Sequence, residues 1–145
     1  MKIFDVQSVE IHAPYDLVFN YVADPANLPE WTHAFASVDG RWATMRTPAG
    51  STDVELSTTV ERNAGTIDWS MTFPTGEKAR AWSRVVPHRA GRVIYSFVLM
   101  APPVPLEKVE GTLAEQSKAL AAELALLQRI VEARAKSADA AVPVR

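Results

Sequence analysis

The last third of the chain carries the clearest hydrophobic pattern. Between Pro105 and Ala135, apolar residues recur in steps of three and four, and Gln116 fills the one gap. The stripe consists of Leu106, Val109, Leu113, Leu120, Leu124, Leu127 and Val131. This spacing places the stripe on one side of a 3.6-residue helix, with charged residues on the other side. The pattern predicts one amphipathic helix about 40 Å long, which needs an apolar surface to lie on.

The preceding segments predict an antiparallel sheet that supplies this surface. Residues 2–12 are rich in Ile, Phe and Val and are expected to form the first strand. Turn signals at hairpin spacing separate five further expected strands. These strands lie at about 37–46, 52–62, 66–73, 78–86 and 92–100.

Two short helices are expected between the first and second strands. One begins at Ala13–Pro14, and the other opens at Asp24–Pro25 and ends at Pro29. A loop with large side chains then runs from Glu30 to Phe35. The resulting order, β-α-α-β-β-β-β-β-α, belongs to the α+β class.

Alternation along the strands separates two faces of the sheet. In the strand at 52–62, Val54, Leu56, Thr58 and Val60 share one side and polar residues occupy the other. The apolar side is expected to meet the long helix, and the polar side to meet solvent. Register through the turns extends the apolar face to Val38, Gly40, Trp42, Thr44, Ile67, Trp69, Met71, Phe73, Ala79, Ala81, Ser83, Val85, Val93, Tyr95, Phe97 and Leu99. The polar face receives Asp68, Arg80, Trp82 and Arg84.

One strand of the apolar face carries small side chains. Ala79, Ala81 and Ser83 lie between strands that carry Trp69, Met71, Tyr95 and Phe97. Two interpretations stay open. Large residues can interlock with small ones in a filled core, or the small residues can widen a ligand-sized space with aromatic walls.

Composition indicates one ordinary globular domain. The chain has 145 residues, 48% of them hydrophobic and 22% charged, with a net charge of −2. We expect a single domain over 1–136 and a disordered tail over 137–145. The even mixture of charges gives no basic patch for nucleic acid, and the absence of cysteine excludes disulfides and thiolate chemistry. Acidic residues near the start do not resemble an export signal, and no apolar run is long enough to cross a membrane, so we expect a cytoplasmic protein.

Candidate chemistry is sparse. The sequence has no Gly-rich phosphate loop, no spaced pair of metal-binding histidines and no nucleophile elbow. His12, His33 and His88 are each isolated, and His33 is the best candidate for acid–base work because it lies in an aromatic loop. A surface-loop histidine is the more common alternative. Tyr95 and Ser83 are expected to be cross-strand neighbours whose hydroxyls bind either each other, a water or a ligand.

Several further residues have two interpretations each. The Gln116 amide faces the sheet and needs a partner, which is a protein group, a water or a ligand. Trp42, Trp69, Met71 and Phe97 are either plain core or ligand wall. The cations at Arg80 and Arg84 form a solvated face, unless the register slips by one residue and turns them into an internal anion site.

The N-terminal motifs resemble one known family. They are Ile11-His12-Ala13-Pro14, Val18-Phe19, Asp24-Pro25, Leu28-Pro29 and Trp31. With the hairpins and the terminal helix, they resemble the START-like (SRPBCC) superfamily, in particular its polyketide cyclase/dehydrase-type branch, which is similar to the birch pollen allergens. This resemblance implies a helix-grip fold: a curved antiparallel sheet around the C-terminal helix, with two short helices at one end and a deep apolar pocket. The superfamily has no universal catalytic motif, so the resemblance assigns no catalytic residue.

The expected function is the binding or carrying of a hydrophobic small molecule, such as a lipid, a polyketide or another aromatic or isoprenoid-like compound. The expected ligand-binding residues are Trp31, His33, Phe35, Trp42, Leu56, Trp69, Met71, Ala81, Ser83, Tyr95, Phe97, Leu113, Gln116 and Leu120. No metal, cofactor or nucleic acid is expected, and the protein is a monomer or a homodimer.

Two alternatives stay open. One is a cyclase or dehydratase that needs no cofactor and uses Tyr95, Ser83, Gln116 or His33 to polarise a carbonyl or move a proton. The other is an interaction module without ligand, which uses the region around Trp82 and has a solid core.

Overall fold

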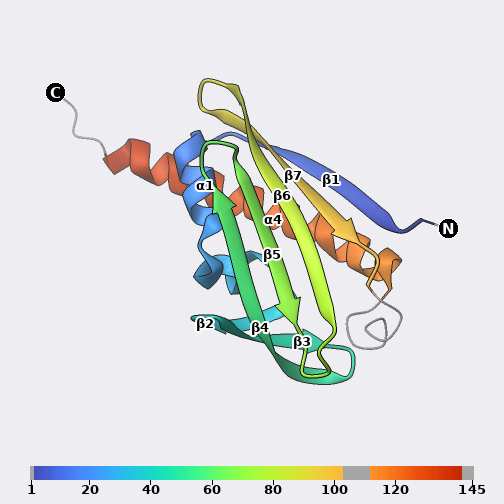
Figure 1. Ribbon diagram of the computed structural model, residues 1–145. Helices are drawn as coiled ribbons and strands as arrows, with labels where there is room; N and C mark the ends of the chain where they lie inside the picture. Colours follow the sequence, from blue (N-terminus) through green and yellow to red (C-terminus); the bar gives the residue numbers. More distant parts are fainter. Residues whose placement is uncertain (1, 103–111, 142–145) are drawn as a thin grey trace.

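The computed structural model describes residues 2–102 and 112–141. In chain order, its elements are β1 (Phe4–Ile11), α1 (Tyr15–Ala23), the 3₁₀ helix η1 (Pro25–Asn27), α2 (Leu28–Trp31), β2 (Phe35–Asp39), β3 (Trp42–Thr47), β4 (Gly50–Glu61), β5 (Thr66–Thr72), β6 (Lys78–Arg89), β7 (Arg92–Met100) and α4 (Leu113–Ala141). The fold is α+β, with a curved antiparallel sheet around a C-terminal helix, which is the helix-grip arrangement (Figure 1).

Within the described residues, the sheet has seven strands in the order β1-β7-β6-β5-β4-β3-β2. Figure 1 shows the sheet from its outer face, with α4 running behind it. On the inner face, α4 packs against β1 and β7, and α1 and α2 pack against α4 near its middle and C-terminal part. The long helix and two short helices therefore cover one face of the sheet.

The expected strand at 37–46 is two strands, and this changes which side chains are buried. Gly40 and Arg41 form a tight turn, with a φ of 59° at Gly40, and Asp39 pairs with Trp42 across it. The turn moves β3 by one residue, so Ala43 and Met45 are buried and Trp42 is 50% exposed. A shift of one residue turns every side chain of a strand to the opposite face, so the expectation that Trp42 faces inward was wrong.

The remaining apolar face is confirmed with one exception. Buried positions predicted from the register are Val54, Leu56, Ile67, Trp69, Met71, Phe73, Ala79, Ala81, Ser83, Val85, Val93 and Tyr95. Val60, close to the β4–β5 turn, is instead 47% exposed. On the opposite face, Trp82, Arg80 and Arg84 are exposed as expected.

Pro29 does not end the second helical segment. It lies in the first turn of α2, which continues to Trp31. Proline is tolerated there because the first N–H groups of a helix have no helical partner. The loop expected from Glu30 to Phe35 is therefore reduced to residues 32–34.

The C-terminal helix begins and ends later than its hydrophobic stripe predicts. Thr112 precedes α4 as its cap: its hydroxyl accepts from the Glu115 N–H at 3.3 Å, and the Glu115 carboxylate accepts from the Thr112 N–H at 3.0 Å. The helix continues to Ala141, so residues 137–141 of the expected tail extend it. Leu106 and Val109 of the predicted stripe lie outside the described residues. Within α4, the positions confirmed as buried are Leu120, Leu124, Leu127 and Val131.

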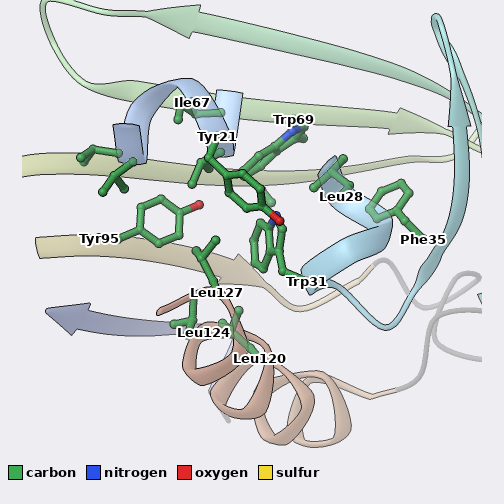
Figure 2. Packing of buried hydrophobic residues seen from close by; sticks show 14 of the residues in the cluster. Tyr21, Leu28, Trp31, Phe35, Ile67, Trp69, Tyr95, Leu120, Leu124 and Leu127 are labelled. Carbon is green, nitrogen blue, oxygen red and sulfur yellow. The ribbon is translucent and has the colours of Figure 1, made fainter. Parts of the chain in front are cut away.

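The core fills the space between α1, α4 and the sheet. Figure 2 shows Tyr95, Leu124 and Leu127 together there, with Trp31 beside them. Tyr95 and Leu127 are completely buried. None of the helices in the described part of the chain has the length and apolarity needed to cross a bilayer.

Candidate functional site

A cavity of about 690 Å³ lies between the inner face of the sheet and the first turns of α4. Its walls come from α2 and the loop after it, from β3, β5, β6 and β7, and from α4. A volume of this size is typical of sites that enclose a small organic molecule. The structure therefore favours the widened space over the completely filled core.

Nine of the fourteen expected ligand-binding residues line this cavity. They are Trp31, His33, Phe35, Trp69, Met71, Ala81, Phe97, Gln116 and Leu120. Gln116 has an interaction partner of its own. The structure thus brings together residues from α2, the sheet and α4 that lie far apart in the sequence.

The other five are Trp42, Leu56, Ser83, Tyr95 and Leu113. Trp42 points outward because of the turn before β3. Leu56 is buried on the inner face of β4, and Leu113 is half-buried at the first position of α4.

The hydroxyl groups of Ser83 and Tyr95 belong to the packed core. The Ser83 hydroxyl donates to the Ile67 carbonyl at 2.6 Å, so a protein group satisfies it. Tyr95 packs edge-on against Trp31, with ring centroids 6.5 Å apart. Burial raises the pKa of the Tyr95 phenol, a shift that the nearby Ser83 hydroxyl opposes. Because the Ser83 hydroxyl is directed at Ile67, the Tyr95 hydroxyl has no well-formed hydrogen bond.

The small side chains of β6 have a specific effect on the inner wall. Ala81 pairs with Trp69 of β5 on one side and with Leu99 of β7 on the other. The rings of Trp69 and Phe97 stack with centroids 5.9 Å apart, although β6 separates their strands. Small residues on β6 let these rings meet above it, so the two aromatics form one wall.

Two indole N–H groups at the cavity lack hydrogen-bond partners. The side chains of Trp31 and Trp69 are 2% and 5% exposed, and neither Nε1 has a hydrogen-bond partner. A buried donor without an acceptor costs about 1–3 kcal/mol. Both residues line the cavity, so the apolar wall contains two unsatisfied donors.

Two charged residues at the cavity hold the loop between α2 and β2. The Glu123 carboxylate of α4 accepts from the His33 N–H at 2.8 Å, and the Arg46 guanidinium of β3 donates to the His33 carbonyl at 3.0 Å. Burial raises the pKa of Glu123, while the hydrogen bond from His33 opposes that shift. His33 therefore contributes its backbone to these contacts, and its side chain is exposed.

The sequence interpretation missed both charged residues. A signal for Glu123 was present, because it follows Gln116 by seven residues and so lies on the same side of the helix. Arg46 follows Met45, whose inward position appears only after the β2–β3 turn is recognised. Other lining residues not predicted include Leu28, Ala34, Met45, Ala79, Leu99 and Ala119.

The other two histidines are not isolated. His12 Nε2 lies 3.0 Å and His88 Nε2 lies 3.5 Å from the Glu10 carboxylate. The hydrogen bond from His12 lowers the pKa of Glu10. None of these three residues lines the cavity.

The cavity is chemically suited to binding. Among its described lining residues, no carboxylate pairs with a histidine side chain, and Glu115 and Glu123 both accept from backbone N–H groups. In residues 2–102 and 112–141, no group of three or more His, Asp or Glu side chains could hold a metal ion. The polar groups are therefore separate from one another rather than arranged as an acid–base pair.

Comparison with known proteins gives a family match over most of the chain. Residues 6–132 match the family described as polyketide cyclase/dehydrase and lipid transport. A comparison with curated proteins gives no match.

Solved structures share the fold. The protein XoxI from Bacillus cereus superposes with a TM-score of 0.64 at 14% identity, covering 90% of this chain and 96% of that one. The Zhui aromatase/cyclase from Streptomyces sp. R1128 superposes with a TM-score of 0.62 at 14% identity, covering 92% and 93%. A START superfamily protein from Mycobacterium smegmatis gives 0.58 at 17% identity, covering 94% and 99%. At these identities the likeness concerns the fold alone.

Proposed function

The chain belongs to the polyketide cyclase/dehydrase and lipid transport family, and from this premise we propose that it binds or carries a hydrophobic small molecule between the sheet and α4. The observation that carries the proposal is the cavity of about 690 Å³ with aromatic and aliphatic walls. Burial of apolar ligand surface in such a space supplies the binding free energy.

The walls also indicate what kind of molecule fits. A lipid, a polyketide or another aromatic or isoprenoid-like compound matches the stacked rings of Trp69 and Phe97 and the aliphatic side of α4. A carbonyl or hydroxyl oxygen on that ligand could accept from the indole N–H of Trp31 or Trp69. The proposed contacts are the nine lining residues named above, together with Met45 and Leu28.

A filled-cavity variant tests this proposal. Native mass spectrometry of the freshly purified protein searches for a bound lipid-like mass, and titration with the apolar dye anilinonaphthalene sulfonate measures affinity. Ala81→Phe places a ring in the cavity and should weaken dye binding about tenfold or more. Ala90→Phe adds the same ring at an exposed turn and should bind like the unmodified protein. A folded Ala81→Phe variant with unchanged dye affinity would contradict the proposal.

A cyclase or dehydratase is the second candidate, and Glu123 is the observation that favours it. Its carboxyl lines the cavity, and burial raises its pKa above the ordinary value of a glutamate, a direction typical of carboxyls that act as general acids. An enzyme of this class would convert a linear β-polyketone analogue into a product lighter by one water, and Glu123→Gln would abolish the conversion. We place this candidate second because the lining residues contain no acid–base pair.

The third alternative, an interaction module with a solid core, is not retained. Its premise was a filled interior, and the structure has a cavity there instead.

A further inference from the structure

The outer face of the sheet carries an apolar patch at β1, β7 and β6. Val6 pairs with Val98, and Val98 pairs with Trp82, so these three side chains lie in one row. Phe4 and Met100 form the next row, two residues along β1 and β7 on the same face. We call these five residues the outer patch. Four of them are large exposed hydrophobics: Phe4 at 47%, Val6 at 49%, Trp82 at 37% and Met100 at 37%.

The charges on the outer face of β6 beside the outer patch are cationic. On the same face of β6, Lys78 and Arg80 precede Trp82 and Arg84 follows it. Neither β6 nor β7 contains an acidic residue. The side chains of Lys78 and Arg80 make no ion pair or hydrogen bond to any described residue, and the Arg84 side chain donates only to the Ala64 carbonyl. One carboxylate, that of Asp68, faces Trp82 across the strands, because the two residues pair in register.

Part of the outer patch lies on β6 and β7, two of the strands that also form the wall of the cavity. Trp82 and Met100 of the patch, and the adjacent cations Lys78 and Arg80, are among the residues that line the cavity. In Figure 1 the start of β6, the end of β7 and the first turn of α4 lie at the same end of the molecule. This end of the sheet therefore presents an apolar, cationic surface beside residues that line the cavity.

We propose that the outer patch docks on an anionic membrane surface and that the hydrophobic ligand passes between bilayer and cavity there. Unpaired cations are attracted to anionic lipid headgroups, and a half-exposed Trp beside aliphatic residues suits the boundary between headgroups and acyl chains. A second copy of the chain fits less well, because a symmetric contact would bring the cations of both copies together. The transfer step rests on the proposed function, whereas docking itself does not.

Vesicle binding tests docking. Sedimentation with phosphatidylcholine vesicles that contain phosphatidylglycerol should remove the protein from solution, and this binding should weaken as salt is raised. Vesicles of pure phosphatidylcholine should bind it much less. The double substitution Phe4→Ser and Val6→Ser should weaken binding about tenfold, and Lys78→Gln with Arg80→Gln should remove the preference for phosphatidylglycerol.

Trp42→Ser is the matched control, since Trp42 is also an exposed Trp on the outer face but lies on β3, away from the patch. It should sediment like the unmodified protein. The proposal is overturned if the unmodified protein stays in solution with both vesicle types, if the Phe4/Val6 variant binds as before, or if the patch instead produces a dimer by light scattering.

Dye binding separates this test from that of the proposed function. Phe4 and Val6 do not line the cavity, so their variant should still bind the dye. Ala81→Phe should lose the dye but keep vesicle binding. If no variant and not even the unmodified protein binds the dye, while vesicle binding is intact, the proposed ligand binding is contradicted and the proposed docking surface is not.

Discussion

At the scale of single residues, backbone geometry explains Gly65. This residue has a φ of +78°, and its carbonyl accepts from the Val85 N–H at 2.8 Å. A Cβ atom there would lie 2.2 Å from the Val85 carbonyl oxygen. Glycine is therefore required for two reasons, because side chains disfavour this φ and because no space exists for one.

Gly65→Ala should destabilise the protein more than Gly76→Ala does. Gly76 also has a positive φ, +88°, but nothing lies within 4 Å of its Cβ position. Both substitutions cost about 1 kcal/mol of backbone strain, and only Gly65→Ala adds a collision with backbone. Urea denaturation of the two variants measures the difference, and equal losses would contradict the argument.

Glu123 should make the stability of the protein depend on pH. Its folded pKa is raised above the ordinary value of 4.5, so the folded state holds the proton more tightly than the unfolded state. The free energy of unfolding should therefore fall as pH rises from 4.5 through the raised pKa. Glu123→Gln keeps an oxygen acceptor for the His33 N–H and removes the charge, so this fall should disappear.

Denaturant titrations at a series of pH values compare Glu123→Gln with the unmodified protein. The variant should be the more stable of the two at neutral pH. A variant that keeps the same slope, or is less stable at neutral pH, would show that burial of the Glu123 charge is not the dominant effect.

At the scale of elements, the C-terminal half of α4 is fastened to the short helices by Arg134. Its guanidinium donates to the Glu30 carboxylate at 3.2 Å and lies 4.6 Å from the centre of the Tyr21 ring. The Tyr21 hydroxyl donates to the same carboxylate at 2.7 Å. One cation thus joins α4 to both α1 and α2.

Arg134→Ala should lower the free energy of unfolding by about 1 kcal/mol, from the cation–π contact and a half-exposed ion pair. Arg129→Ala is the control, because Arg129 is exposed on the same helix and makes no contact of this kind with the described residues. Chemical denaturation measures both variants, and equal stabilities would mean that the contact contributes nothing.

Most of the strands and the long helix could be predicted from the sequence. Strict alternation in β4, hairpin turns of known length and the spacing of Leu120, Leu124 and Leu127 were enough to place the sheet, the helix and most of the inner face. The β2–β3 turn was missed although Asp39-Gly40 is a hairpin dipeptide. Without this turn, the two faces of β3 were exchanged in the prediction. Trp42 was therefore placed on the inner face, and the inward position of Met45 was not recognised.

The charged contacts of the site and the presence of a cavity were harder to predict than the residues of its walls. Six wall positions follow from register and helix period, because each period fixes a direction, and Trp31, His33 and Phe35 follow from the cluster of large side chains after the second short helix. Arg46 and Glu123 act on the backbone of His33, in a three-residue loop that no periodicity describes. Whether small residues leave a cavity depends on how far rings such as Trp69 and Phe97 reach across β6, which is a property of packing.

At the scale of the whole molecule, a curved sheet and one helix enclose a volume that the side chains of residues 2–102 and 112–141 do not fill. A ligand that fills it binds the folded state and not the unfolded chain, so it should stabilise the fold. At a concentration one hundred times its Kd, the gain is about 2.7 kcal/mol.

Thermal denaturation with the apolar dye should therefore show a Tm raised by about 5–10 °C at saturation. The folded Ala81→Phe variant should show little or no rise, and Ala90→Phe should show the full rise. An equal rise in all three proteins would place the dye outside the cavity.

The width of the cavity depends on β6, which contributes Ala79 and Ala81 to its wall. β6 is hydrogen-bonded to β5 on one side and to β7 on the other, and this pairing holds its backbone beside the cavity. Exchange of Ala79 or Ala81 for Gly, Ser or Val would change the volume of the cavity in small steps and leave the pairing of the strands as it is. We expect one or two substitutions at these positions to change the size of the molecule that the cavity admits, while the fold stays the same.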